Sequence, residues 1–198
     1  MKKILLTIVG VLLASVAGAD AKIGSAAPEF SVQDAQGKTH KLSDYKGKYV
    51  ILEWYNKDCP YVRKHYDSKN MQKLQTDMTA KGYAWLSVIS SAPGKQGHQN
   101  AADTLKNAEK EGSKASAILR DEDGKLGKAY GAKTTPHIYL INPEGTLLYN
   151  GAIDSNDSAD PKTIAKAENY LVRAVASAEK GEKIAKATSK PYGCSVKY

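Results

Sequence analysis

The sequence predicts an α/β domain with a central mixed sheet and helices on both faces. Between residues 49 and 131, apolar segments of strand length alternate with segments of helical periodicity, which is typical of parallel strands joined by helices. Residues 142–145 form a turn signal between two further apolar segments, so we expect an antiparallel hairpin at one edge of the sheet.

The first long strand and the helix after it are the elements that place the chemistry. Residues 49–55 are a buried apolar segment of strand length, and Pro60 suits the first turn of the helix that follows. Residues 67–70 indicate a break in this helix, which then continues to Gly82.

The remaining elements alternate in the same way. We expect further strands at residues 83–89, 117–119, 137–141 and 147–149. We expect further helices at residues 100–111 and 126–130, and one last helix from Pro161 to about Gly181, with Asp160 as its N-cap.

The two ends of the chain differ from this domain. Residues 1–21 combine a basic start, an apolar stretch and small residues, which predicts a cleaved signal peptide. The domain then spans residues 22–181, and residues 182–198 form a basic C-terminal tail that contains Cys194. We therefore expect an exported protein, in a bacterium a periplasmic one, that does not span the membrane after cleavage.

The net charge points to an ordinary basic surface. The formal net charge is +8, or +7 without residues 1–21, and the basic residues are spread along the chain rather than gathered in blocks. This distribution is typical of a solvated surface, and together with export it argues against a nucleic-acid partner.

Cys59 is the candidate reactive residue. It lies between the strand at residues 49–55 and Pro60, at an edge of the sheet where ligands bind in this fold class. A helix N-terminus stabilises a thiolate, which is the nucleophilic form of cysteine. The alternative is a small buried core cysteine.

Residues 50–62, which run from the strand through Cys59, resemble the active-site strand and turn of the thioredoxin-like redoxins, of the alkyl hydroperoxide reductase and thiol-specific antioxidant type. Residues 26–30, 121–131 and 134–141 are similar to the opening, the central segment and the proline loop of that family. The resemblance covers roughly residues 22–175 and implies a thioredoxin-like fold.

The resemblance also implies the roles of the site residues. Cys59 would be the nucleophile, and Thr135-Pro136 would be a cis-proline step whose loop faces Cys59 and, with Pro60, meets the substrate. The implied partners are a thiol or disulfide protein, or a hydroperoxide, together with an external reductant. Neither a cofactor nor a metal is expected, and the oligomeric state stays open.

Two departures from the family patterns bear on the mechanism. The dithiol motif of thioredoxins is Cys-x-x-Cys, and Val62 stands at its second cysteine, so no neighbouring thiol can release a mixed disulfide on Cys59. Peroxiredoxins carry a proline and a threonine before their cysteine, where this chain has Leu52 and Asn56.

Cys194 is the second thiol of interest. It either resolves or pairs with Cys59, forms a disulfide elsewhere, or stays a free thiol in the tail. The leading hypothesis is a thiol oxidoreductase with Cys59 as nucleophile, and the rival enzyme is a thiol peroxidase with Cys194 as resolving residue. A third interpretation is a non-catalytic binding module that holds a metal through Cys59 and His137.

Overall fold

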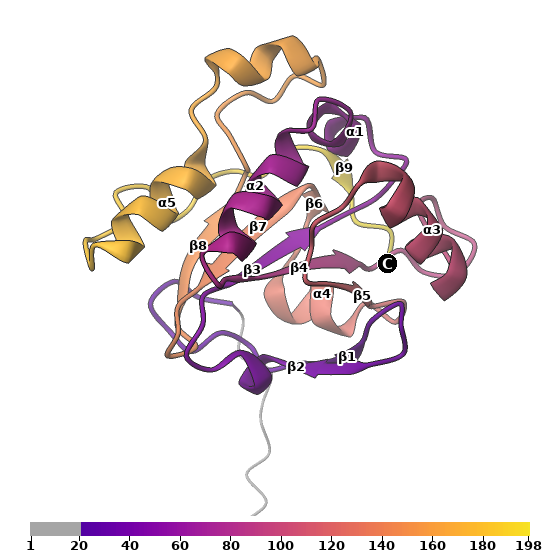
Figure 1. Cartoon of the computed structure of the whole chain (residues 1–198), viewed down its shortest axis with the longest axis horizontal. Helices are drawn as coiled ribbons and strands as arrows, with labels where there is room; N and C mark the ends of the chain where they lie inside the picture. The colour runs from indigo at the N-terminus through magenta and orange to yellow at the C-terminus, as the bar shows by residue number, and fades with distance from the viewer. Residues whose placement is uncertain (1–20) are drawn as a thin grey trace, which may run out of the picture.

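A five-stranded mixed sheet forms the centre of the molecule, which is described here by a computed structural model covering residues 21–198 (Figure 1). In sheet order the strands are β5 (Ala117–Arg120), β4 (Ala84–Ile89), β3 (Val50–Trp54), β7 (His137–Ile141) and β8 (Leu147–Gly151). β5, β4 and β3 are parallel, whereas β7 and β8 are the predicted antiparallel hairpin. The predicted α/β class and the thioredoxin-like fold are therefore confirmed.

Both faces of the sheet are covered. On one face lie α1 (Pro60–Asp67), α2 (Asn70–Ala80), α3 (Ala101–Glu111) and α5 (Tyr170–Glu179). On the other face lie α4 (Lys125–Tyr130) and an N-terminal unit of β1 (Ser31–Gln33), β2 (Thr39–Lys41) and the 3-10 helix η1 (Leu42–Tyr45). Each face has its own apolar core, and the fully buried strand β3 contributes to both, as expected when both faces are covered.

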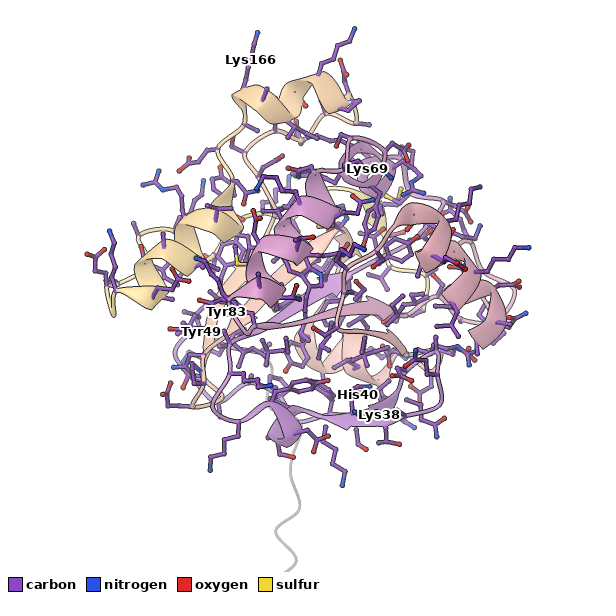
Figure 2. The ribbon with its side chains drawn as sticks, in the orientation of Figure 1. Lys38, His40, Tyr49, Lys69, Tyr83 and Lys166 are labelled. Carbon is purple, nitrogen blue, oxygen red and sulfur yellow. The ribbon has the colours of Figure 1, made fainter. Side chains whose placement is uncertain are left out.

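The helix break predicted at residues 67–70 separates α1 from α2. Lys69, labelled at this junction in Figure 2, has a φ of 62°, a left-handed conformation that a helix interior does not accept. Its amino group donates to the Glu111 carbonyl at the end of α3, so the break is tied to a neighbouring helix.

The prediction of one helix from Pro161 to Gly181 was wrong. The structure has a short 3-10 helix, η2 (Pro161–Lys166), followed by a separate α5. Ala167 is extended, and the Asn169 side chain caps α5 by accepting from the Val172 amide. A cap of this kind competes with a continuous helix, because its backbone conformation is not helical. η2 stands out from the sheet beside α1, and Lys166 points away from the body (Figures 1 and 2).

The C-terminal tail packs on the domain as a strap, which we define as residues 187–198. Its strand β9 (Cys194–Ser195) pairs antiparallel with β6 (Thr134–Thr135), a short strand just before β7. The expected signal peptide lies outside the described residues, except for Ala21. Within residues 21–198, no helix is long and apolar enough to cross a membrane.

Candidate active site

Cys59 occupies the N-cap of α1, directly after the turn that follows β3. Its backbone carbonyl accepts from the amides of Val62 and Arg63, and Pro60 is the first helical residue. The Asn56 side chain holds the turn by accepting from the Asp58 amide at 2.9 Å and donating to the Gln96 carbonyl. The cysteine is thereby fixed at a helix N-terminus, where a negative charge is stabilised.

The proline loop faces Cys59. The Thr135-Pro136 peptide bond is cis, and the Cys59 thiol donates to the Thr135 carbonyl at an Sγ–O distance of 3.0 Å. The Cys59 side chain is fully buried beneath this loop. The structure thus brings together three of the residues that the sequence analysis singled out.

Cys194 reaches the same place from the strap. It is the strand partner of Thr135, whose carbonyl accepts a hydrogen bond from the Cys59 thiol, and its side chain interacts electrostatically with that of Cys59. Both cysteines are free, with Cys59 buried and Cys194 half-buried. A thiol from the far end of the chain therefore stands beside Cys59, although Val62 leaves no thiol at the usual helical position.

The two thiols have opposite pKa shifts. Burial by itself raises the pKa of Cys59, but its interactions with Cys194, Thr135 and the backbone of Val62 outweigh this effect, so that the pKa lies below its ordinary value. Burial and the interaction with Cys59 raise the pKa of Cys194 to about 11. The lowered pKa of Cys59 and the raised pKa of Cys194 make Cys59 the more readily ionised thiol of the pair, and therefore the better candidate for the nucleophile.

The basic residues near Cys59 in sequence serve other contacts. Lys57 pairs with Asp58, and Arg63 pairs with the Glu111 carboxylate at 2.5 Å. Lys64 is buried and donates to the Asn156 carbonyl at 2.8 Å, with Asp154 at 3.7 Å. The lowered pKa of Cys59 therefore comes from its interactions with Cys194, Thr135 and the backbone of Val62 rather than from these basic side chains.

A buried polar cluster anchors the strap next to Cys194. The Tyr192 hydroxyl donates to the Asp154 carboxylate at 2.6 Å and lies 3.2 Å from His65 Nε2, while the Lys64 ammonium sits over the Tyr192 ring. Burial lowers the pKa of His65 to about 4, so this ring is neutral at neutral pH. The cluster fixes the strap two residues before its cysteine.

His137 does not face Cys59. Its Nε2 is 2.7 Å from the Asn150 side-chain oxygen, and its Nδ1 lies near the Lys133 amide and the Tyr139 hydroxyl. Among residues 21–198, no three side chains of the metal-binding types gather into a possible site. The alternative metal site through Cys59 and His137 therefore has no geometric support in this part of the chain.

Glu53 is a buried acid that the sequence analysis missed. It is fully buried in β3 and accepts from Trp85 Nε1 at 2.7 Å, the Tyr66 hydroxyl at 2.9 Å and the Ser87 hydroxyl at 3.1 Å. Burial raises its pKa to about 7 despite these hydrogen bonds. A lone acidic residue inside an apolar strand was the signal available in the sequence.

Comparisons with known proteins find similar chains among thiol-dependent enzymes. The model of the AhpC/TSA family matches residues 23–150. The thiol-disulfide oxidoreductase ResA of Geobacillus thermodenitrificans is 28% identical over 137 residues, which cover 68% of this chain and 73% of the relative. The peroxiredoxin Bcp of Bacillus subtilis is 51% identical, but over only 37 residues, which cover 19% of this chain and 24% of the relative.

Solved structures extend the likeness to nearly the whole chain. A hypothetical protein from Sinorhizobium meliloti has a TM-score of 0.75 at 21% identity, and the match covers 91% of this chain and 96% of that one. The thioredoxin domain of a thiol-disulfide oxidoreductase from Bacteroides vulgatus has a TM-score of 0.52 at 24% identity, covering 73% and 96%. At these identities the likeness concerns the fold.

Proposed function

Because the chain belongs to the AhpC/TSA family, we propose that it is a thiol–disulfide oxidoreductase with Cys59 as nucleophile and Cys194 as internal partner. The observation that carries this proposal is the meeting of the two thiols at Thr135. The similarity to thiol-disulfide oxidoreductases named ResA supports the same reaction class.

The reaction begins at Cys59. Its thiolate attacks one sulfur of a substrate disulfide, a Cys59–substrate disulfide forms, and the other substrate sulfur leaves as a thiolate that takes up a proton. Cys194 then loses its proton and attacks Cys59 Sγ, which forms the Cys59–Cys194 disulfide and releases the second substrate thiol. The substrate gains two electrons and the chain loses two, which an external dithiol returns.

The coupling of the two thiols suits the order of these steps. While Cys59 is charged, its charge and its hydrogen bond help to keep Cys194 protonated. Formation of the mixed disulfide removes both effects, so the pKa of Cys194 falls when its thiolate is needed. The resting enzyme thus keeps one nucleophile, and the second becomes reactive after the first has acted.

A thiol peroxidase is the second candidate, favoured by the short match to peroxiredoxin Bcp. In that reaction Cys59 would attack a hydroperoxide, and Cys194 would condense with the resulting sulfenic acid to release water. The polar side chains available for a peroxide favour it less, because the Asn56 side chain is bonded to Asp58 and Gln96, and Arg120 is paired with Glu122.

Two assays separate these candidates. We expect the purified protein to catalyse insulin reduction by dithiothreitol, to consume hydrogen peroxide slowly, and to lose insulin reduction in the Cys59→Ser variant. Mass spectrometry without added reductant should find Cys59 joined to Cys194 after oxidation. Fast peroxide consumption without insulin reduction would replace the first candidate by the second.

We further propose that the chain is exported. The support is the signal-peptide pattern of residues 1–21, with residues 22–181 as the domain and 182–198 as its tail. The exporting cell would then be bacterial and the destination the periplasm, an oxidising compartment that suits a thiol–disulfide site. N-terminal sequencing of protein from the osmotic-shock fraction should begin at Lys22, and a sequence that begins at Met1 would contradict export.

A further inference from the structure

The strap occupies the backbone edge that lies beside Cys59. Ser195 and Cys194 are the strand partners of Thr134 and Thr135, and the Val196 amide donates to the Lys133 carbonyl at 3.1 Å. Within residues 21–198, β6 has no strand partner other than β9. An external segment can therefore pair with this edge only after the strap has left it.

The register of the strap delivers a cysteine to Cys59. Cys194 stands opposite Thr135, whose carbonyl accepts a hydrogen bond from the Cys59 thiol. Any extended segment bound in the same register presents the side chain at this position to Cys59, because strand pairing fixes which residues face each other. The strap is thus arranged as a substrate would be.

The position before the cysteine accepts only a very small residue. A Cβ on Gly193 would lie 2.0 Å from the Thr135 carbonyl oxygen and 2.8 Å from its carbonyl carbon, and Gly193 has a φ of 132°. Both clashes are with backbone, which cannot move aside as a flexible side chain does. Glycine is the residue that tolerates this approach and this conformation.

The strap can leave without opening the core. None of residues 181–198 is fully buried: Tyr192, Cys194 and Val196 pack against the edges of the two cores, and the rest of the strap is held by polar contacts. The last of these is the Tyr198 hydroxyl bond of 2.8 Å to the Ala132 carbonyl, and Tyr198 itself is 38% exposed. Terminal segments with few buried contacts open locally at a small fraction of the free energy of global unfolding.

We propose that the substrate is an extended protein segment with glycine immediately before its reactive cysteine, which binds along Thr134–Thr135 in place of the strap. This inference rests on the proposed function. The substrate cysteine, as one half of a disulfide, takes the position of Cys194. Cys59 attacks its sulfur, the substrate S–S bond breaks, and the other half leaves as a thiolate that takes up a proton. The segment then comes off the Thr134–Thr135 edge while still joined to Cys59, and the strap returns with Cys194, whose sulfur attacks Cys59 Sγ. This step releases the segment as a thiol and leaves the internal disulfide.

The test uses the full chain with Cys194→Ser, so that a mixed disulfide on Cys59 stays trapped. The probe is a peptide with the sequence of residues 190–197, its cysteine activated as a disulfide with thionitrobenzoate, whose coloured release reports attack on the peptide sulfur. A second peptide carries valine in place of its glycine. The thionitrobenzoate dimer, Ellman's reagent, measures the reactivity of Cys59 toward a small disulfide.

Two substitutions loosen the strap on this background. Gly193→Ala places a Cβ against Thr135, and Tyr198→Phe removes the hydroxyl bond to Ala132 while keeping the ring. Gly181→Ala is the matched control, because Gly181 also has a positive φ but open space around its Cβ position. Tyr198→Phe keeps the test valid if Gly193→Ala folds poorly.

We expect the glycine peptide to react about tenfold faster when the strap is loosened, a difference of roughly 1.4 kcal/mol, with a smaller change for Ellman's reagent and none in the control. The valine peptide should be about tenfold slower than the glycine peptide on the loosened protein. Equal rates for the two peptides, or peptide rates that do not change when the strap is loosened, would overturn the inference. If Cys59 still reacts with Ellman's reagent in that case, the proposed function stands. A Cys59 inert to Ellman's reagent in every variant would overturn both.

Discussion

The Tyr192 hydroxyl donates a hydrogen bond of 2.6 Å to the Asp154 carboxylate, two residues before Cys194. This bond ties the tail to the loop that follows β8, and Asp154 is itself buried beside Lys64 and His65. The position of Cys194 beside Cys59 therefore depends on a contact outside the reacting atoms, which makes Tyr192 a positioning residue.

Tyr192→Phe should weaken the link between the two cysteines. A hydrogen bond to a charged group contributes about 1.5–3 kcal/mol, so the Cys59–Cys194 disulfide should become about tenfold easier to reduce with glutathione. Redox equilibria followed by mass spectrometry would measure this. Tyr170→Phe is the control, because that hydroxyl accepts only from the exposed Lys186. An unchanged equilibrium in Tyr192→Phe would mean that the strap is positioned by its strand pairing alone.

Removal of the Cys194 thiol should raise the pKa of Cys59. The interaction with Cys194 is the largest of the effects that lower this pKa, so Cys194→Ala should shift the pH profile of Cys59 alkylation to higher pH. Conversely, Cys59→Ala should lower the pKa of Cys194 from about 11. Ser195→Ala, in the same strand, should leave the Cys59 profile in place. If Cys194→Ala and Ser195→Ala give the same profile, the two thiols are not coupled.

The sequence predicted the local parts of this site better than the distant ones. The strand before Cys59 and the helix that begins at Pro60 follow from apolar patterning and from the preference of proline for a first helical turn. The docking of the strap does not follow from such patterns. It depends on contacts between residues 66 positions apart, such as Tyr198 with Ala132, and the tail has no periodicity that would predict its partner.

The interruption of the last helix and the buried Glu53 were not predicted either, and both have physical reasons. Asp160 and Pro161 do begin a helix, but Asn169 caps a second one, and the apolar face of residues 164–178 concealed the interruption. Glu53 was missed because a buried strand is predicted from a run of apolar residues. A carboxyl group can also be buried in such a strand when neighbours such as Trp85 and Tyr66 donate hydrogen bonds to it.

The fold should need neither cysteine. Both are free, and the two apolar cores include fully buried residues such as Ile51, Trp85 and Leu119. A chain with Cys59→Ser and Cys194→Ser should lose at most about 3 kcal/mol of stability, the usual range for single buried substitutions, and should still melt cooperatively. Circular dichroism with a thermal melt tests this. A doubly substituted chain that is unfolded at room temperature would show that the thiols serve the scaffold.

The buried Glu53 should make the folded chain less stable as the pH rises. Its pKa is about 7 in the folded chain and 4.5 as the ordinary value, so between these pH values the native state holds a proton that the unfolded state has released. The native state is then favoured at low pH, and this contribution is lost as the pH rises through about 7. Integrated over the window, the loss is about 3 kcal/mol.

The comparison of wild type with Glu53→Gln isolates this effect, because the amide keeps the size of the side chain without its titration. His65 and His137, whose pKa values burial lowers to about 4, act in the opposite direction below pH 6.5, and they cancel in the difference between the two proteins. Urea unfolding at pH 5 and pH 8 should therefore find the variant gaining about 2.5 kcal/mol relative to wild type as the pH rises. A difference that stays constant between these pH values would mean that the folded Glu53 carboxyl titrates as it does in the unfolded chain, and that its burial does not raise its pKa.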